Sequence, residues 1–219
     1  MESDDKYQKC IVTLANNAGW YKKGQDRLLQ SLANNFDGDV LAFTSEDQVG
    51  APKHDENPYA FKPYCFYEAL KQGYKQVLWL DSSVWAVRNI QPIFDILQND
   101  GYFMLDSGFY IKDWINDGCL NYFNLKIEQL ITHKLFLAGL FGLNCNHPKS
   151  REFLLKWKNA ADSGAFIGSW QNHRHDMTCG SVIANKLGMK YLQAEYYSSY
   201  IGSEYQAPNE TSYFHLQGM

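Results

Sequence analysis

Short apolar runs alternate with amphipathic segments along this 219-residue chain. Residues 10–14 and 39–43 have the length and composition of strands, and the leucines of residues 25–34 share one helical face. Residues 77–80 form a continuous apolar run, typical of a strand covered on both faces of a parallel sheet. This run ends at Asp81. Because ligands of open α/β sheets bind outside the carboxyl ends of the strands, we expect Asp81 to face a binding site. A carboxylate that caps the next turn is the alternative.

The same alternation continues to residue 192. Spacing predicts helices from residue 63 to about 73 and over residues 90–97, 148–161 and 177–187, and strands over residues 102–105, 135–143 and 191–192. Residues 15–24 and 44–57 have the composition of loops, and residues 107–134 fit no single pattern. The tyrosine-rich last 25 or so residues lack a period, and we expect them to lie across the domain. Right-handed crossovers then predict an α/β fold with a parallel sheet, as one domain over residues 1–219.

Composition narrows the class of protein. A net charge of −4 argues against general nucleic-acid binding, which needs a basic face. The acidic N-terminus is unlike a secretory signal, and the longest apolar stretch, residues 135–143, is about half a membrane span. We therefore expect a soluble, cytoplasmic protein without a membrane span. Its scattered cysteines contain no CxxC pair, so reduced, buried thiols are expected rather than a disulfide framework or a zinc knuckle: Cys10, Cys65, Cys119, Cys145 and Cys179.

Several segments, in their order, resemble GT-A fold glycosyltransferases, which use nucleoside diphosphate sugars as donors. They are TLANN (13–17), FKPYCFYEALKQGYKQVLWLDSSV (61–84), LAGLFGLNCNHPKSREFLLKW (137–157), HRHDMTCGSVIANKLGM (173–189) and FHLQGM (214–219). The resemblance covers nearly the whole chain. It implies a Rossmann-like GT-A fold, with a central, mostly parallel mixed sheet flanked by helices. It also implies transfer of a sugar, with UDP as the favoured nucleotide, to a carbohydrate or other hydroxyl acceptor.

The strand that ends in Asp81 is similar to the hhhhDxD motif of this family. There the carboxylates bind a divalent cation that bridges the two donor phosphates, and the middle residue touches the ribose. The resemblance therefore implies Asp81 and Ser83 as ligands of Mn²⁺ or Mg²⁺, and Ser82 as a donor contact. Because Ser83 replaces the second carboxylate, we expect a weakened metal site.

Donor-binding positions are also implied by the order of the segments. Ala15, Asn16 and Asn17 lie where the family cradles the base and ribose, and Tyr21 could stack on the base. An ordinary turn is the alternative. Lys62 lies where a basic residue often reaches the donor phosphates, although a lone lysine is as often simply solvated.

The second half of the chain supplies the remaining implied site residues. Ala138 and Gly139 match the strand that lines the donor sugar, with tight sheet packing as the alternative. Asp176 matches the acid of the family's DQ or ED segment, which orients the donor sugar or, in inverting members, acts as the base. A helix N-cap is the alternative for Asp176. His173 and His175 are expected to face solvent.

The C-terminal segment resembles the HxxG of glycogenin-like retaining transferases. This implies His215 as a metal ligand that favours Mn²⁺, and Gly218 as a contact of the diphosphate. It also favours retention of configuration. The lysine that follows the motif in that family is missing, since the sequence stops at Met219, and we expect a domain cut from a longer protein.

Two other classes remain open on the sequence alone. A haloacid-dehalogenase-like phosphatase also has an apolar strand ending in DxDx(T/V), with Asp81 as the nucleophile, but that strand usually lies near the start of the chain. A sugar-nucleotide-binding protein without turnover would explain the missing carboxylate.

Tyrosines of the tail could offer rings to an acceptor: Tyr196, Tyr197, Tyr200 and Tyr205.

Overall fold

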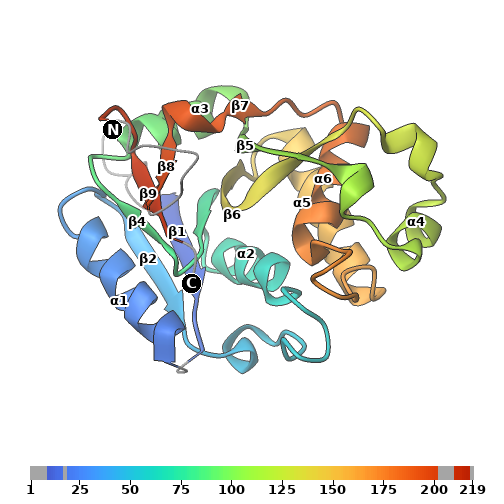
Figure 1. Ribbon diagram of the computed structural model, residues 1–219. Coiled ribbons are helices and arrows are strands. Elements are labelled where there is room, and N and C mark those ends of the chain that lie inside the picture. The colour runs from blue at the N-terminus through green and yellow to red at the C-terminus, as the bar shows by residue number, and fades with distance from the viewer. Residues whose placement is uncertain (1–8, 17–18, 202–209, 218–219) are drawn as a thin grey trace.

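A mixed β-sheet forms the centre of the protein. The computed structural model describes residues 9–16, 19–201 and 210–217 (Figure 1). Within these residues the larger sheet has six strands in the order β2-β1-β3-β6-β5-β7. β1 pairs in parallel with β2 and β3, and β5 pairs in parallel with β7, whereas β6 runs antiparallel to β3 and β5. The strands are β1 (Lys9–Leu14), β2 (Asp39–Phe43), β3 (Gln76–Leu80), β5 (Tyr102–Tyr110), β6 (Lys134–Asn144) and β7 (Leu192–Gln193).

Helices cover both faces of this sheet. They are α1 (Gly19–Leu32), α2 (Phe61–Lys71), α3 (Gln91–Asp100), α4 (Asp117–Phe123), α5 (Pro148–Asp162) and α6 (His175–Lys186). The apolar side chains of α2, α5 and α6 pack in one core, and those of α1 and α3 pack in a second core on the other face. Short 3₁₀ turns lie between these elements: η2 (Glu46–Val49), η3 (Ile111–Asp113), η4 (Ile127–Leu130) and η5 (Ala194–Tyr196). The predicted α/β class, with a mostly parallel mixed sheet flanked by helices, is confirmed.

The period of two in β3 explains why this strand is apolar throughout. Val77 and Trp79 point into the first core, while Leu78 and Leu80 point into the second. Both sets are buried. Asp81 follows directly, so two layers of packing fix the point at which its side chain leaves the sheet.

The C-terminal segment crosses its own domain, as the sequence predicted. Three short strands form a second sheet in the order β4-β9-β8: β4 (Val84–Ala86), β8 (Ser198–Tyr200) and β9 (Phe214–Leu216). β9 runs antiparallel to β4, just after Asp81, and parallel to β8. Phe214 and Leu216 are buried in the second core. The aromatic tail is therefore anchored beside the carboxyl end of β3.

Several predicted boundaries were wrong. Residues 15–24 are not one loop, because α1 already begins at Gly19. Gly24 lowers helix propensity, but a Cβ there would lie 2.4 Å from the carbonyl oxygen of Ser82, so close packing explains this glycine. Asp106 does not end a strand, since β5 continues to Tyr110 with register shifts along its pairing with β6.

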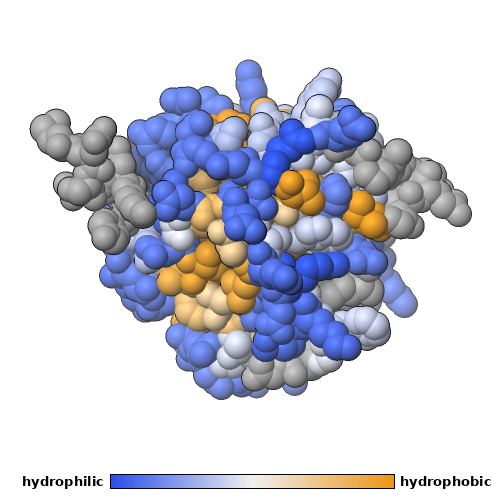
Figure 2. Space-filling view, turned by 90° about the vertical axis from the view of Figure 1, so that its left-hand side faces the viewer, coloured by the Kyte–Doolittle hydropathy of each residue, from blue (hydrophilic) through white to orange (hydrophobic). Residues whose placement is uncertain are grey.

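The edge of the sheet at β2 is only partly covered. Residues 40–43 are half-buried, in contrast to the buried residues of β3. On the side that carries α1 and β2, an apolar area is bordered by hydrophilic residues (Figure 2). Among the described residues, no helix has the length and apolar character needed to cross a bilayer.

Candidate functional site

Asp81 lies in the loop between β3 and β4, at the carboxyl end of β3. Its main-chain N–H donates to the carbonyl of Gly139 (2.9 Å), which extends the β3–β6 pairing by one residue. Its Oδ1 accepts a hydrogen bond from Trp79 Nε1 (2.7 Å). Trp79 lies two residues earlier on the same strand, so period two places both side chains on one face. Sequence reasoning missed Trp79, although this spacing could have found it.

Lys62 links Asp81 to Asp176. Its Nζ lies 3.2 Å from Asp81 Oδ1 and 3.0 Å from Asp176 Oδ2, and it donates to the carbonyl of Ala138 (2.9 Å). The lysine side chain is only 3% exposed. Burial opposes its charge, but attraction to Asp176 and Asp81 outweighs this and raises the pKa of Lys62. The solvated alternative for Lys62 is therefore wrong.

Asp176 is the buried member of this cluster. It lies in the first turn of α6, whose N-cap is Arg174, so the N-cap alternative for Asp176 is also wrong. Burial raises the pKa of Asp176 from 3.8 to about 6, and the ion pair with Lys62 opposes that rise. The distance to Lys62 suits a hydrogen bond, but Asp176 Oδ2 has no donor in suitable geometry. The pKa of this buried carboxyl therefore lies close to neutral pH.

Strand β6 forms the wall beside these acids. A Cβ at Gly139 would lie 2.8 Å from Asp81 Oδ2, so only glycine leaves the carboxylate in place. Ala138 is buried, and its carbonyl accepts from Lys62. Both residues pack tightly, as the alternative expected. Their contact with a donor sugar stays a prediction.

Aromatic rings surround the lysine. Lys62 Nζ lies 5.2 Å from the ring centre of Tyr59 and 5.3 Å from that of Trp79. Tyr59 packs against His175 at 5.5 Å, and both residues have positive φ angles, 61° and 45°. Residues held in this sparsely populated conformation cluster at functional sites. Sequence reasoning missed Tyr59, and its pattern carried no signal for it.

The positions after β1 lie at different depths. Ala15 is buried and Asn16 is exposed, whereas Tyr21 is 49% exposed on the first turn of α1. Burial, the negative charges of Asp176 and Asp81, and a smaller effect of Tyr21 raise the pKa of Tyr59. Asn17 lies outside the described residues.

The residues after Asp81 face the C-terminal sheet. Ser82 is buried and Ser83 is half-buried, and the carbonyl of Ser83 accepts from the main-chain N–H of Gln217 (3.2 Å). His215 packs edge-to-face on Trp85, with ring centres 5.6 Å apart, and burial lowers its pKa. Gly218 lies outside the described residues, as does Tyr205.

Tyr200 ends β8 and is 38% exposed. Partial burial and the negative charge of Asp81 both raise the pKa of Tyr200. Tyr196 is 59% exposed, and Tyr197 packs edge-to-face on Phe103. Tyr197 thus serves packing, whereas Tyr196 and Tyr200 are open to solvent.

The histidines beside Asp176 do not face solvent, contrary to prediction. His173 is fully buried, and His175 is 3% exposed. His175 Nδ1 lies 2.9 Å from the carbonyl of Phe166. The sequence segment HRHD is polar, but it folds under Trp170, whose ring stacks on His175. Tertiary packing therefore overrides its polar appearance.

Known proteins share this fold at low sequence identity. No family model and no curated protein matches the sequence. Among solved structures, a glycosyltransferase involved in the glycosylation of the major capsid of PBCV-1 has a TM-score of 0.60 and 11% identity, over 95% of this chain and 92% of that one. Mouse xyloside xylosyltransferase 1 has a TM-score of 0.54 and 10% identity, over 96% and 97%.

A third similar structure is a larger protein. The bifunctional glycosyltransferase WbbM has a TM-score of 0.56 and 11% identity over 98% of this chain, and the chain spans 46% of its length. The fold is thus that of GT-A nucleotide-sugar glycosyltransferases, as the sequence resemblance implied. The fold therefore does not support the alternative of a haloacid-dehalogenase-like phosphatase.

Proposed function

We propose that this protein transfers a sugar from a nucleoside diphosphate sugar, with UDP as the nucleotide, to a hydroxyl acceptor. The observation that carries the proposal is the cluster of Asp81, Lys62 and Asp176 at the carboxyl end of β3. Ligands of open α/β sheets bind outside the carboxyl ends of the strands. The domain is proposed to comprise residues 1–219.

Asp81 has an oxygen that suits a divalent cation. Lys62 and Trp79 both contact Oδ1, so these two partners leave Oδ2 for another ligand beside Gly139. Carboxylate oxygen is a preferred ligand of Mg²⁺ and Mn²⁺. We propose that Asp81 holds the cation with Ser83 and His215, whose neutral imidazole favours Mn²⁺. When bound, such a cation neutralises the diphosphate as it leaves.

Lys62 is best suited to position the two acids. Its ammonium group donates to the Ala138 carbonyl and lies within ion-pair distance of both Asp81 and Asp176. We therefore assign the phosphates not to Lys62 but to the cation, and assign Gly218 and the segment Ala15–Asn17 to the donor as the resemblance implies.

The pKa of Asp176 suits proton transfer or hydrogen bonding at neutral pH. A carboxyl with a pKa of about 6 is mostly ionised at pH 7 and can accept a proton or a sugar hydroxyl's hydrogen bond. With retention of configuration, its role is to orient the donor sugar next to Ala138 and Gly139. With inversion, it would take the proton of the acceptor hydroxyl.

The test is a donor panel with matched variants. The protein is titrated calorimetrically with UDP-sugars, with and without Mn²⁺, and release of UDP is followed. Asp81→Asn should abolish metal-dependent donor binding. Asp106→Asn is the control, because Asp106 is a strand acid of similar exposure (34% against 32%) that also pairs with a lysine, Lys134.

Three results would contradict parts of this proposal. Unchanged donor affinity in Asp81→Asn removes Asp81 from the site. Tight donor binding without UDP release, across all acceptors tried, favours a sugar-nucleotide-binding protein without turnover. Inversion at the anomeric carbon, read by NMR of the product, overturns retention and makes Asp176 the base.

A further inference from the structure

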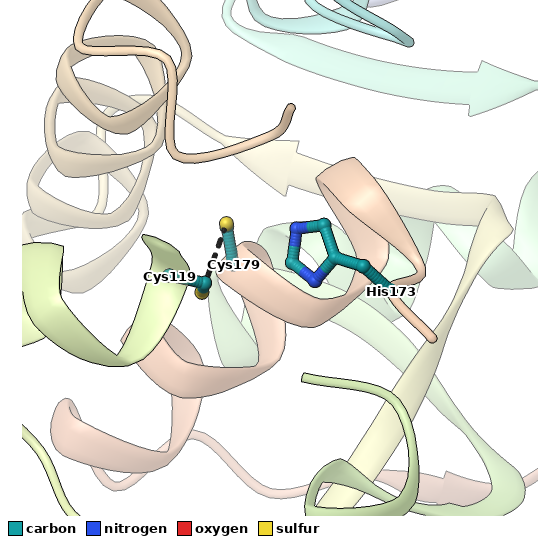
Figure 3. Close-up of side chains that lie close together, drawn as sticks. All are labelled: Cys119, His173 and Cys179. Atoms are coloured by element: carbon teal, nitrogen blue, oxygen red, sulfur yellow. Dashed lines mark hydrogen bonds between the residues drawn. The ribbon is translucent and has the colours of Figure 1, made fainter. Parts of the chain in front are cut away.

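A buried cluster of two cysteines and a histidine lies at the start of α6. Cys119 comes from α4, His173 from the loop before α6, and Cys179 from α6 itself. Their ligand atoms all lie within 4.8 Å of one another, and all three residues are fully buried. Figure 3 shows the imidazole beside Cys179, with one ring nitrogen turned toward the sulfur. Two segments far apart in sequence, α4 and the residues around the start of α6, thus place these ligands at one point.

A main-chain oxygen completes the arrangement. The carbonyl oxygen of Ala165 lies 3.1 Å from His173 Nε2 and 3.2 Å from Cys179 Sγ. The two sulfurs are 3.4 Å apart. The cluster therefore offers two thiols, an imidazole and a carbonyl, a donor set with four members.

The histidine is incompletely satisfied in this arrangement. Nδ1 of His173 is buried and forms no hydrogen bond of suitable geometry, although the main chain of Trp114 is near enough to the ring to favour its protonation. An unpaired buried polar atom is destabilising, because it has lost its hydrogen bonds to water. If Nε2 binds a metal, the ring proton moves to Nδ1, on the side available to a carbonyl, which is the usual arrangement for metal-bound histidine.

We infer that Cys119, His173 and Cys179 form a structural Zn²⁺ site, with the Ala165 carbonyl as the fourth ligand. Zinc bonds of about 2.3 Å to sulfur and about 2.0–2.2 Å to nitrogen or oxygen imply tetrahedral edges of about 3.3–3.8 Å. Three of the six edges, at 3.1, 3.2 and 3.4 Å, need to widen by only a few tenths of an ångström. The distances from His173 to the two sulfurs lie within 4.8 Å and adjust to the same range when the ion binds.

The charge balance also suits a buried ion. Binding releases one proton from each thiol, and the two thiolates neutralise Zn²⁺ while the imidazole stays neutral. Thiolate and imidazole ligands select zinc over Mg²⁺ or Mn²⁺, so this site is chemically distinct from the one proposed at Asp81. The spacing 119, 173, 179 has no CxxC pair, which is why the sequence argued against a zinc site.

Such an ion would fix the start of α6. Cys179 lies three residues after Asp176 on α6, so a metal bound there ties this helix to α4 and to the loop that carries His173. The site would thus hold the helix whose first turn places Asp176 against Lys62. This is a positioning role, and it does not depend on whether the protein transfers a sugar.

The test measures the metal directly. The reduced, metal-free protein is titrated with Co²⁺ and then Zn²⁺, and bound metal is counted by native mass spectrometry. We expect one ion per chain, a sulfur-to-cobalt charge-transfer band that Zn²⁺ abolishes, and a higher Tm with zinc. Cys119→Ser and Cys179→Ser should each weaken affinity at least about 100-fold. Cys145→Ser, at another buried free cysteine, is the matched control.

The outcomes separate this site from its rivals. Absence of the charge-transfer band in the reduced wild-type protein overturns the inference, even if the variants fail to fold. So does unchanged affinity in both cysteine variants. A disulfide between Cys119 and Cys179 in freshly purified, metal-free protein would instead make the pair redox-active. Asp81→Asn should leave the band unchanged, so failure of the donor site cannot be mistaken for failure of this one.

Discussion

Replacing Asp176 with asparagine should change how stability depends on pH. The carboxyl of Asp176 is 3% exposed, and burial raises its pKa from 3.8 to about 6. The folded state therefore holds the proton more tightly than the unfolded state. Stability from this linkage is fully present below pH 3.8 and is lost as the pH rises through about 6.

The size of the effect follows from the shift. One pKa unit is about 1.4 kcal/mol, so a shift of about two units is worth about 3 kcal/mol over the whole range. Between pH 5 and pH 7 the wild-type protein should lose about 1–1.5 kcal/mol relative to Asp176→Asn. Lys62 stays charged throughout this window, because attraction to the acids raises its pKa.

Urea unfolding at pH 5, 6 and 7 measures this difference. Other titrating groups, such as His173, whose pKa burial lowers to about 4, occur in both proteins and cancel. Asp176→Glu keeps a titratable group and should retain the pH dependence. If an ionised Asp176 is needed for transfer, kcat/KM should also fall below pH 6 in the wild type alone. Parallel stability curves for wild type and Asp176→Asn would refute the reasoning.

Other changes test the rest of the site. Lys62→Met leaves a buried carboxylate unpaired and should lower the free energy of unfolding by about 3–5 kcal/mol. An unchanged urea midpoint would show that the ion pairs of Lys62 with Asp81 and Asp176 do not stabilise the fold. Gly139→Ala must displace the Asp81 carboxylate and should lower kcat/KM about 100-fold in a folded protein, whereas wild-type kinetics would show that the carboxylate is free to move. His215→Ala should raise the Mn²⁺ requirement roughly 10–100-fold, and Ser83→Asp should lower it; unchanged Mn²⁺ titrations would exclude both residues from the metal site.

The central strand and its acid were predictable because their signal is local. Four apolar residues in a row require cover on both faces, and β3 has it from two cores. The parallel order of β1, β2 and β3 followed from the crossover rule, and β6 was identified as a strand despite its glycines. Glycines misled the prediction of α1, because Gly19 and Gly24 made its first turns resemble a loop.

The contacts of Lys62 were not predictable from any local pattern. Its acceptor Ala138 is 76 residues away, and Asp176 is farther still along the chain. The resemblance placed Lys62, Ala138 and Asp176 at the site one by one, but it gave no reason for a lysine to join two carboxylates. That reason is electrostatic: the two acids repel each other, and the positive charge of Lys62 between them offsets this repulsion.

The cysteine and histidine cluster shows the opposite limit of sequence reasoning. Zinc motifs are recognised when their ligands are close in sequence, since a short turn then fixes their geometry. Here His173 and Cys179 lie close together in sequence, but Cys119 comes from α4, and only packing brings it to them. The same packing buries His173, His175 and Asp176 of the segment HRHD, which looked solvated. His173, Asp176 and Cys179 share the start of α6, and all three are buried. A polar segment at a helix start should therefore be tested for burial before it is assigned to the surface.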